Sequence, residues 1–208
     1  MQLARILLAT SLSLTPVVAV TVAQAPQANP DTTGLVLVEA ESFAATGGWV
    51  VDQQFMDFMG SPYLLAHGLG IPVQDAHTDV AFAQPGRYRV WVRTRDWVAP
   101  WQAPGAPGRF ELQLNGRTLK TTFGTEGADW HWQDGGVVDA TASTKLTMHD
   151  LCGFEGRCDA ILFSKDLSFQ PPHGGGELAE LRGKLLGWDR EPKDGGSFDL
   201  VVVGGGIA

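Results

Sequence analysis

The stretch Arg-Tyr-Arg-Val-Trp-Val-Arg-Thr-Arg, residues 87–95, decides the fold. One parity of this run is aromatic, aliphatic or Thr, and the other parity carries four arginines around Trp91. Because successive side chains of a strand point to opposite faces, the pattern predicts a strand with one face in a core and the other face solvated and cationic. The arginines could bind an anion, but pairing with carboxylates of neighbouring strands is the simpler interpretation.

Further short strands are expected on both sides of this run. Phe110–Leu114 alternates in the same way, and Asn115-Gly116 after it indicates a hairpin, since a type I′ turn needs positive φ at both central residues. The other strands are expected at 35–41, 79–82, 117–123, 136–140, 145–149 and 159–163, with loops and short strands over 47–77. Together with 26 Gly and 12 Pro, this predicts a mainly β, antiparallel sandwich.

Composition and net charge indicate which kinds of partner this chain can bind. The 208 residues have 44% hydrophobic and 18% charged content, which is ordinary for a globular protein with a real core. The formal net charge is −8, from 23 acidic and 15 basic residues. Nucleic-acid binding needs clustered cations that release counterions from phosphates, so we expect no nucleic-acid partner.

The first 25 residues have the pattern of a secretory signal peptide. Arg5 precedes an apolar run over 6–22, and Ala23-Gln24-Ala25 is a small-x-small cleavage pattern. An uncleaved membrane anchor is the alternative, but the run is short for a membrane span and polar at its centre. We therefore expect export to the periplasm or the extracellular space, with cleavage after Ala25 and no membrane contact afterwards.

Two cysteines, Cys152 and Cys158, lie close together in the sequence Cys-Gly-Phe-Glu-Gly-Arg-Cys. In an exported chain, a close and even pair predicts a disulfide, which here would hold one loop. A metal-binding pair is less favoured, because no His or Cys lies at the spacing of a zinc site.

After Lys165 the composition changes. Residues 168–197 are predicted to be a linker with a short helix, because leucines at 178, 181, 185 and 186 have helical spacing and Gly187 can cap the end. The domain organisation is then a signal peptide (1–25), a β-sandwich (35–167), this linker, and a last segment (198–208).

The last segment is a strand-like apolar run, Asp199–Val203, that enters Gly204-Gly205-Gly206. It resembles the N-terminal fingerprint of FAD-dependent oxidoreductases of the two-dinucleotide-binding type. The resemblance implies the truncated first strand of a Rossmann-type α/β domain, with these glycines beside the pyrophosphate of FAD. The remaining fingerprint would lie beyond residue 208, so only a full-length protein is expected to hold FAD. The alternative is a glycine-rich tail or some other strand and turn.

The sandwich has a resemblance of its own. Four stretches in order, 38–42, 85–93, 112–116 and 158–162, resemble a jelly-roll carbohydrate-binding module of the galactose-binding type, over residues 35–167. In that family a Glu-x-Glu on the first strand and an Asp on the last can share a structural Ca²⁺. The resemblance implies this role for Glu39, Glu41 and Asp159, and ordinary edge carboxylates are the alternative.

Carbohydrate modules stack sugar rings on aromatic side chains. The candidates are Trp97, Trp101, Trp130 and Trp132, which are expected in loops. Alternatively, these tryptophans close the ends of the sandwich or cover a neighbouring domain. No residue has the context of a catalytic nucleophile.

These patterns predict the N-terminal part of an exported FAD-dependent oxidoreductase, inactive in itself, whose sandwich is an accessory or glycan-binding module. The alternative is a stand-alone carbohydrate-binding or adhesion module without enzymatic activity.

Overall fold

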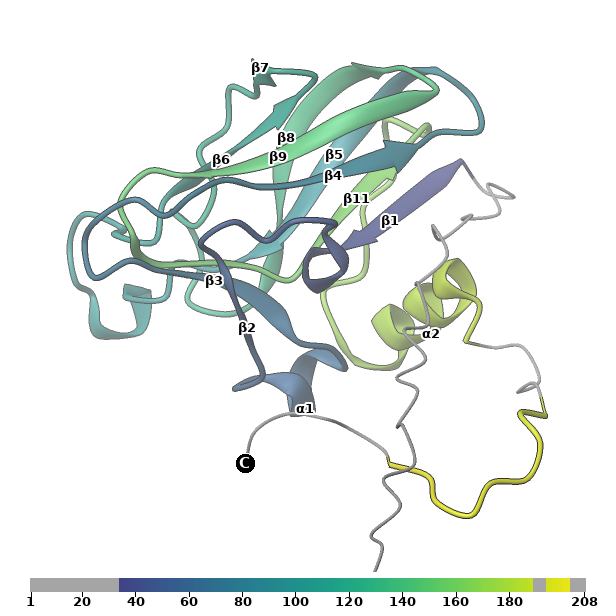
Figure 1. Ribbon diagram of the computed structural model, residues 1–208. Helices are drawn as coiled ribbons and strands as arrows, with labels where there is room; N and C mark the ends of the chain where they lie inside the picture. Colours follow the sequence, from purple (N-terminus) through teal and green to yellow (C-terminus); the bar gives the residue numbers. More distant parts are fainter. Residues whose placement is uncertain (1–33, 189–193, 203–208) are drawn as a thin grey trace, which may run out of the picture.

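The computed structural model describes residues 34–188 and 194–202 (Figure 1). The predicted signal peptide and the glycines at 204, 205 and 206 lie outside these residues. In the described part, antiparallel strands form two larger sheets and one small sheet (Figure 1). No helix in these residues is both long enough and apolar enough to cross a membrane.

The first four-stranded sheet has the order β1-β11-β5-β8, with antiparallel neighbours throughout. Its strands are β1 (Leu35–Glu39), β5 (Gly86–Thr94), β8 (His131–Ala140) and β11 (Ala160–Ser164). The strand predicted over 87–95 is confirmed as β5. Its inward parity is fully buried, at Tyr88, Val90, Val92 and Thr94.

The second four-stranded sheet has the order β4-β9-β6-β7. Its strands are β4 (Ala76–Ala81), β6 (Phe110–Leu114), β7 (Arg117–Thr118) and β9 (Ser143–Asp150). The hairpin is confirmed, because Leu114 lies opposite Arg117 and the two turn residues Asn115 and Gly116 have φ of 49° and 78°. The return strand β7 is shorter than predicted.

The small sheet, β10-β3-β2, extends the sandwich at one end. Its strands are β2 (Val50–Asp52), β3 (Tyr63–His67) and β10 (Phe154–Cys158), of which β10 was not predicted. Three single-turn helices lie between strands: η1 (Ala40–Ser42), α1 (Met56–Met59) and η2 (Ala99–Trp101).

The main core lies between the sheets and is rich in aromatic side chains. Phe82 packs edge-on against Phe163, with ring centroids 5.1 Å apart, and Trp49 packs edge-on against Phe110 at 5.6 Å. This cluster takes inward residues from β1, β5 and β11 as well as from β4, β6 and β9. Burial of this apolar surface is what joins the sheets into one sandwich.

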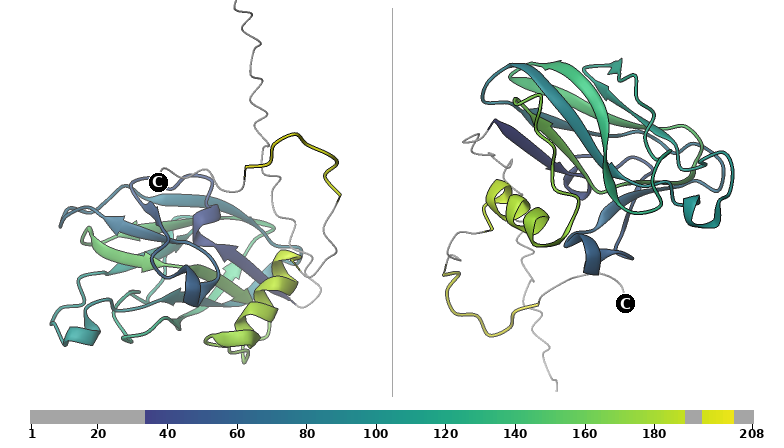
Figure 2. Two further views of the ribbon diagram at one scale, coloured as in Figure 1. Left: turned by 90° about the horizontal axis from the view of Figure 1, so that it is seen from below. Right: turned by 180° about the vertical axis from the view of Figure 1, so that it is seen from behind.

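The predicted helix is confirmed as α2 (Gly175–Leu186), with Gly187 as its left-handed cap at φ 71°. Its role as part of a linker needs correction, because α2 packs on the outer face of the first sheet (Figures 1 and 2). A second hydrophobic cluster fills this contact and includes Trp91, Leu162, Leu178 and Leu185. The outer face of β5 is therefore covered at Trp91 and Arg93, where the alternation predicted a solvated face.

The apolar run near the C-terminus is not part of any sheet. Residues 198–202 form no strand, and Phe198, Leu200, Val201 and Val202 are 66–79% exposed. A parallel-type strand needs neighbours for its backbone N–H and C=O groups, and the described residues provide none here. The start of a Rossmann-type domain is therefore not seen in this structure.

Candidate functional site

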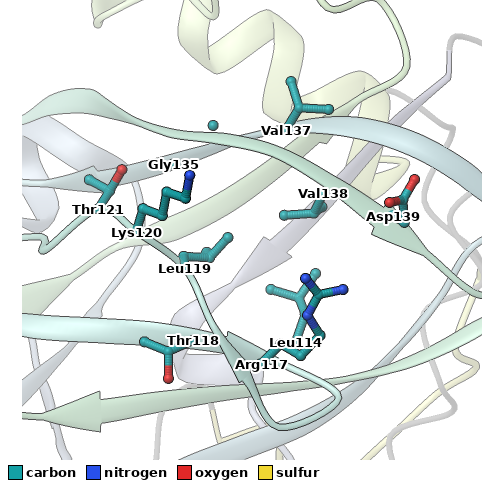
Figure 3. Close-up of a pocket in the computed structure, with 11 residues that line it drawn as sticks. Leu114, Arg117, Thr118, Leu119, Lys120, Thr121, Gly135, Val137, Val138 and Asp139 are labelled. Carbon is teal, nitrogen blue, oxygen red and sulfur yellow. The ribbon is translucent and has the colours of Figure 1, made fainter.

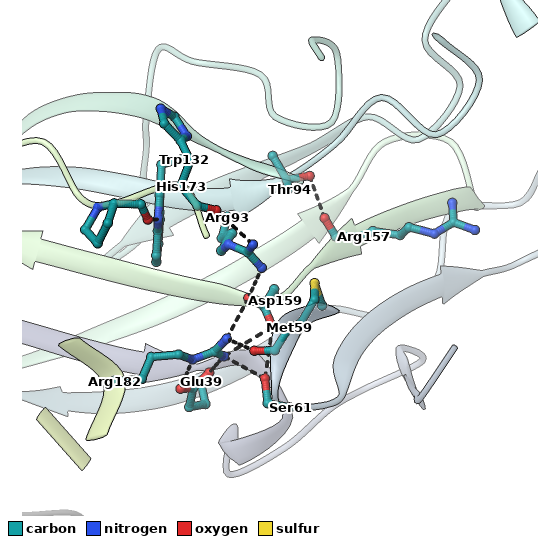
Figure 4. A network of polar contacts seen from close by, with 11 residues as sticks. Glu39, Met59, Ser61, Arg93, Thr94, Trp132, Arg157, Asp159, His173 and Arg182 are labelled. Carbon is teal, nitrogen blue, oxygen red and sulfur yellow. Dashed lines mark hydrogen bonds and ion pairs between the residues drawn. The ribbon is translucent and has the colours of Figure 1, made fainter. Parts of the chain in front are cut away.

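A buried ionic network joins α2 to the sandwich (Figure 4). Glu39 ends β1, Asp159 precedes β11, and both lie on the side of the sheet that α2 covers. Arg182 reaches them from the buried face of α2, where it lies one helical turn from Leu178 and Leu185. Its side chain is 3% exposed, and that of Asp159 is 0% exposed.

Each nitrogen atom of the Arg182 guanidinium donates a hydrogen bond to at least one oxygen atom. It forms a two-point ion pair with Glu39, in which Nε donates to Oε1 at 2.9 Å and Nη2 donates to Oε2. Nη1 and Nη2 each lie 3.3 Å from an oxygen of Asp159. Nη1 also donates to the Met59 carbonyl, and Nη2 also donates to Ser61 Oγ, both at 2.6 Å. Burial alone would lower the pKa of Arg182, but Glu39 and Asp159 outweigh it and raise the pKa.

A second arginine completes the network. Arg93 Nη1 donates to Asp159 Oδ2 at 3.0 Å, and Nη2 donates to the backbone carbonyl of His173 at 3.1 Å. Arg93 thus connects β5 to the segment that leads into α2. Asp159 is in contact with two cations and also accepts from Ser61 Oγ at 3.1 Å.

The structure therefore brings Glu39 and Asp159 together, as predicted, but around a different cation. The guanidinium of Arg182 lies between them, where the resemblance implied Ca²⁺. Glu41 lies nearby with Oε2 buried and without a hydrogen-bond partner in the described residues; burial and the charge of Glu39 raise its pKa to about 8. Among the described residues, no group of three His, Cys, Asp or Glu side chains is placed to hold a metal ion.

The four candidate tryptophans separate into three places. Trp132 lies on β8, not in a loop, and is only 4% exposed under α2, where its Nε1 donates to the Pro172 carbonyl at 2.9 Å. Trp130 packs edge-on against Phe55 and Tyr63, at 5.9 and 5.1 Å between ring centroids. Trp132 is therefore covered by α2, Trp130 is partly buried against these two rings, and the remaining pair includes the most exposed of the four candidates.

Trp97 and Trp101 meet Phe154 at one end of the molecule, and we call these three side chains the aromatic surface. Trp101 is 70% exposed and Phe154 is 41% exposed. Trp97 lies between them, with ring centroids 6.1 Å from Trp101 and 5.6 Å from Phe154. Its Nε1 donates to the Phe154 carbonyl at 3.1 Å, and the Arg157 guanidinium lies 5.4 Å from its ring centroid. Trp97 is thus fixed in place, and the other two rings face outward.

The loop beside this surface adds two exposed apolar residues, Leu69 and Ile71. The loop is held by backbone hydrogen bonds from Gly68 and Gly70 to the Gly153 carbonyl, at 2.9 and 3.0 Å. Gly153 itself has φ of 64°, and a Cβ there would lie 1.9 Å from the Ile71 carbonyl oxygen. Only glycine allows this close approach, which places Phe154 next to the loop.

The predicted disulfide is not formed, and both cysteines are free thiols. Cys152 lies in the turn before β10, with its Sγ against the Pro107 carbonyl oxygen. Cys158 ends β10 and lies in the main core, where burial raises the pKa of its thiol. The two side chains face different surroundings at the two ends of β10, so the close spacing in sequence does not bring the sulfur atoms together.

A cavity of about 520 Å³ opens at the side of the sandwich where β7 and β8 are edge strands. Figure 3 shows Arg117 and Lys120 on the β7 side of this cavity and Asp139 on β8. The lining also includes Leu119 and Val138 but no aromatic ring. A sugar could find hydrogen-bonding groups here but no ring on which to stack.

Comparisons with known proteins agree with this architecture. No protein-family model matches the sequence, and no curated protein matches it. Among solved structures, the chain is similar to the GH26-CBM35 β-(1,4)-mannanase of Podospora anserina, with a TM-score of 0.50 and 19% identity over 66% of this chain and 29% of the mannanase. A family 35 carbohydrate-binding module of Clostridium thermocellum has a TM-score of 0.48 and 16% identity, over 62% of this chain and 96% of the module.

The C-terminal CBM6 of the laminarinase LamC from Zobellia galactanivorans has a TM-score of 0.46 and 15% identity, over 63% of this chain and 99% of that module. The fold is a β-sandwich like that of carbohydrate-binding modules. At such low identity the likeness concerns the fold alone, and the site has to be argued from the residues of this chain.

Two residues of these sites were missed by the sequence analysis. Phe154 belongs to a strand that shows no alternation, so nothing in its neighbourhood indicated a surface. Arg182 had a visible signal: it has the helical spacing of the leucines at 178 and 185, in an otherwise apolar stripe. A cation on the apolar face of a helix indicates a buried carboxylate partner.

Proposed function

We propose that this chain is a glycan-binding module of an exported protein, and that sugar stacks on the aromatic surface. The exposure of Trp101, at 70%, is the observation that carries the proposal. A cluster of large aromatic rings that is exposed to solvent indicates a binding surface, because leaving such rings in water costs free energy. Sugars have apolar ring faces that can cover such side chains, and the carbohydrate-binding-module-like fold supports this class of ligand.

The geometry of the aromatic surface favours a ligand with extended apolar faces over a small deep-bound molecule. Trp101 and Phe154 lie on either side of Trp97, which itself is fixed by a hydrogen bond and by Arg157. A fixed central ring means that little side-chain entropy is lost when a ligand binds.

Changing Trp101 to Ala is expected to weaken glycan binding by roughly tenfold or more, because an exposed aromatic anchor carries a large share of the binding free energy. The measurement is a calorimetric or fluorescence titration with a panel of soluble neutral and acidic polysaccharides. Trp188→Ala is the matched control, since Trp188 is also exposed, at 61%, but lies just after α2 and outside the aromatic surface. Binding that survives Trp101→Ala, or no binding to any polysaccharide, would contradict the proposal.

A second proposal rests on a different observation, the exposed apolar run at 198–202. We propose that this run is the first strand of a dinucleotide-binding domain and that Gly204, Gly205 and Gly206 contact FAD in a longer protein, as their resemblance to the flavin fingerprint implies. Exposure of Phe198, Leu200, Val201 and Val202 supports this, because such side chains are normally covered by neighbouring strands and helices. The parent protein would then be an exported FAD-dependent oxidoreductase.

In a protein that continues this sequence, Gly206→Val is expected to abolish flavin retention, since a β-branched side chain would stand where the pyrophosphate approaches the backbone. Absorbance in the flavin bands of the purified protein is the measurement. Trp101→Ala is the control and should leave flavin content unchanged. A continued protein that stays colourless after reconstitution with FAD and binds NAD would leave only the dinucleotide fold, and binding of neither would remove this second proposal.

A further inference from the structure

The buried oxygen atoms around Arg182 form a set that is typical of a hard cation site. They comprise the carboxylates of Glu39 and Asp159, the Ser61 hydroxyl and the Met59 carbonyl. Carboxylate, hydroxyl and carbonyl oxygens are the ligands that Ca²⁺ takes in proteins. Two carboxylates buried this closely need a cation between them, because an uncompensated buried charge is strongly unfavourable.

The structure does not leave room for a metal ion beside Arg182. The guanidinium already lies within hydrogen-bonding distance of all these ligand atoms, and Nη2 alone contacts Glu39, Ser61 and Asp159. A Ca²⁺ ion would have to lie about 2.3–2.6 Å from the same oxygens. Metal and guanidinium are therefore alternatives at this position, and the chain in its described state uses the guanidinium.

The cation comes from an element outside the sandwich. Arg182 lies on α2, which is joined to β11 by residues 165–174, whereas Glu39, Ser61 and Asp159 all lie within residues 35–164. Arg93, on β5, contacts Asp159 from within the sandwich and does not depend on α2 in the same way. Docking of α2 thus inserts one removable positive charge between oxygen atoms that the sandwich supplies.

We propose that Arg182 is a built-in substitute for a divalent cation: the cage of Glu39, Ser61, Asp159 and the Met59 carbonyl is a latent Ca²⁺ site that α2 fills with its own guanidinium. The sandwich is then independent of calcium while α2 is docked. Removal of the guanidinium uncovers a site with two carboxylates that takes up Ca²⁺ from solution. The proposal does not depend on whether the aromatic surface binds sugar.

Thermal unfolding in EDTA and in millimolar Ca²⁺ tests the proposal. The wild-type chain is expected to melt at the same temperature in both solutions. Arg182→Met keeps the apolar stem but removes the charge, and its Tm in EDTA is expected to be lower by roughly 10 °C, since Glu39 and Asp159 lose a buried partner. In Ca²⁺ this variant should regain about 5 °C or more, as mass action predicts when free calcium far exceeds its Kd.

Two further variants keep the test decisive. The double variant Glu39→Gln/Arg182→Met lacks one ligand and should show no calcium effect. Arg182→Gln also removes the charge but keeps a polar head group, and it replaces the Met variant if that chain does not fold; its Tm should lie below the wild type and rise with Ca²⁺. A wild-type Tm that rises in Ca²⁺ overturns the proposal, and so does an Arg182 variant that is destabilised but indifferent to Ca²⁺.

Discussion

Replacing Asp159 by Ala is expected to lower the free energy of unfolding by about 3–5 kcal/mol, among the largest effects of any single substitution in this chain. Asp159 is fully buried and accepts from Arg93, Arg182 and Ser61 at 3.0 to 3.3 Å. Its removal leaves two buried guanidinium groups with one negative partner fewer. Breaking a buried ion pair costs more than the pair contributes in total, because the charge left behind stays away from water.

Denaturant unfolding followed by tryptophan fluorescence measures this effect as a change in midpoint. Asp139→Ala is the matched control, since Asp139 lies exposed on β8, and its removal should change the free energy of unfolding by less than about 0.5 kcal/mol. Asp159→Asn keeps the shape and one acceptor and should fall between the two. An Asp159→Ala chain as stable as the control would mean that water or a solute compensates both arginines.

Asp159 also shows how far sequence reasoning reaches in this protein. Its place at the start of the last strand, near Glu39 on the first, follows from the strand order of the resembled fold, and the structure brings both residues together. The identity of their cation does not follow, because Arg182 is 143 residues away from Glu39 in sequence. Pairings over such distances depend on where α2 docks, and the periodicity of a helix gives its buried face but not the surface that it meets.

Some strands could likewise be predicted from the sequence pattern, whereas others could not. β5 and β6 alternate strictly because one face lies in the main core, and the Asn-Gly turn fixes its hairpin. β3 is buried at four consecutive residues, 63–66, so that it has no alternation to detect. β10 contains Gly156 at a register irregularity against β3, which interrupts the period of two. Local pattern thus predicts strands whose residue types alternate regularly, and it misses the bulged strand β10.

The tryptophans give the same lesson for the site. All four were expected in loops, where exposure indicates binding, but Trp132 lies on β8 and points to the outer face that α2 covers. Trp130 packs against Phe55 and Tyr63, which lie far from it in sequence. Trp97 and Trp101 are close in sequence and stay together in space. Sequence could therefore identify candidate rings, while the choice among them required the positions of α2 and β3.

A chain that ends at Leu167, the boundary predicted from sequence, is expected to melt at least about 15 °C below one that ends at Trp188, or not to fold at all. The shorter chain lacks α2, so the outer face of the first sheet is uncovered at Leu37, Trp91 and Leu162. It also loses the burial of Leu178 and Leu185, which is worth about 1.5–3 kcal/mol for each side chain. The loss of Arg182 also removes the ion pairs that hold α2 on Glu39 and Asp159.

These losses together are comparable with the whole stability of a domain, about 5–15 kcal/mol, which is why failure to fold is within the expected range. Circular dichroism of both chains on heating is the measurement, and dye binding to exposed apolar surface should increase in the shorter chain. The chain ending at Trp188 is the control, and it should melt like the full 208 residues, because residues 198–202 pack against nothing that holds the sandwich. If the chain ending at Leu167 melts within about 3 °C of the control, α2 is a linker after all, and the contacts of Arg182 contribute little to stability.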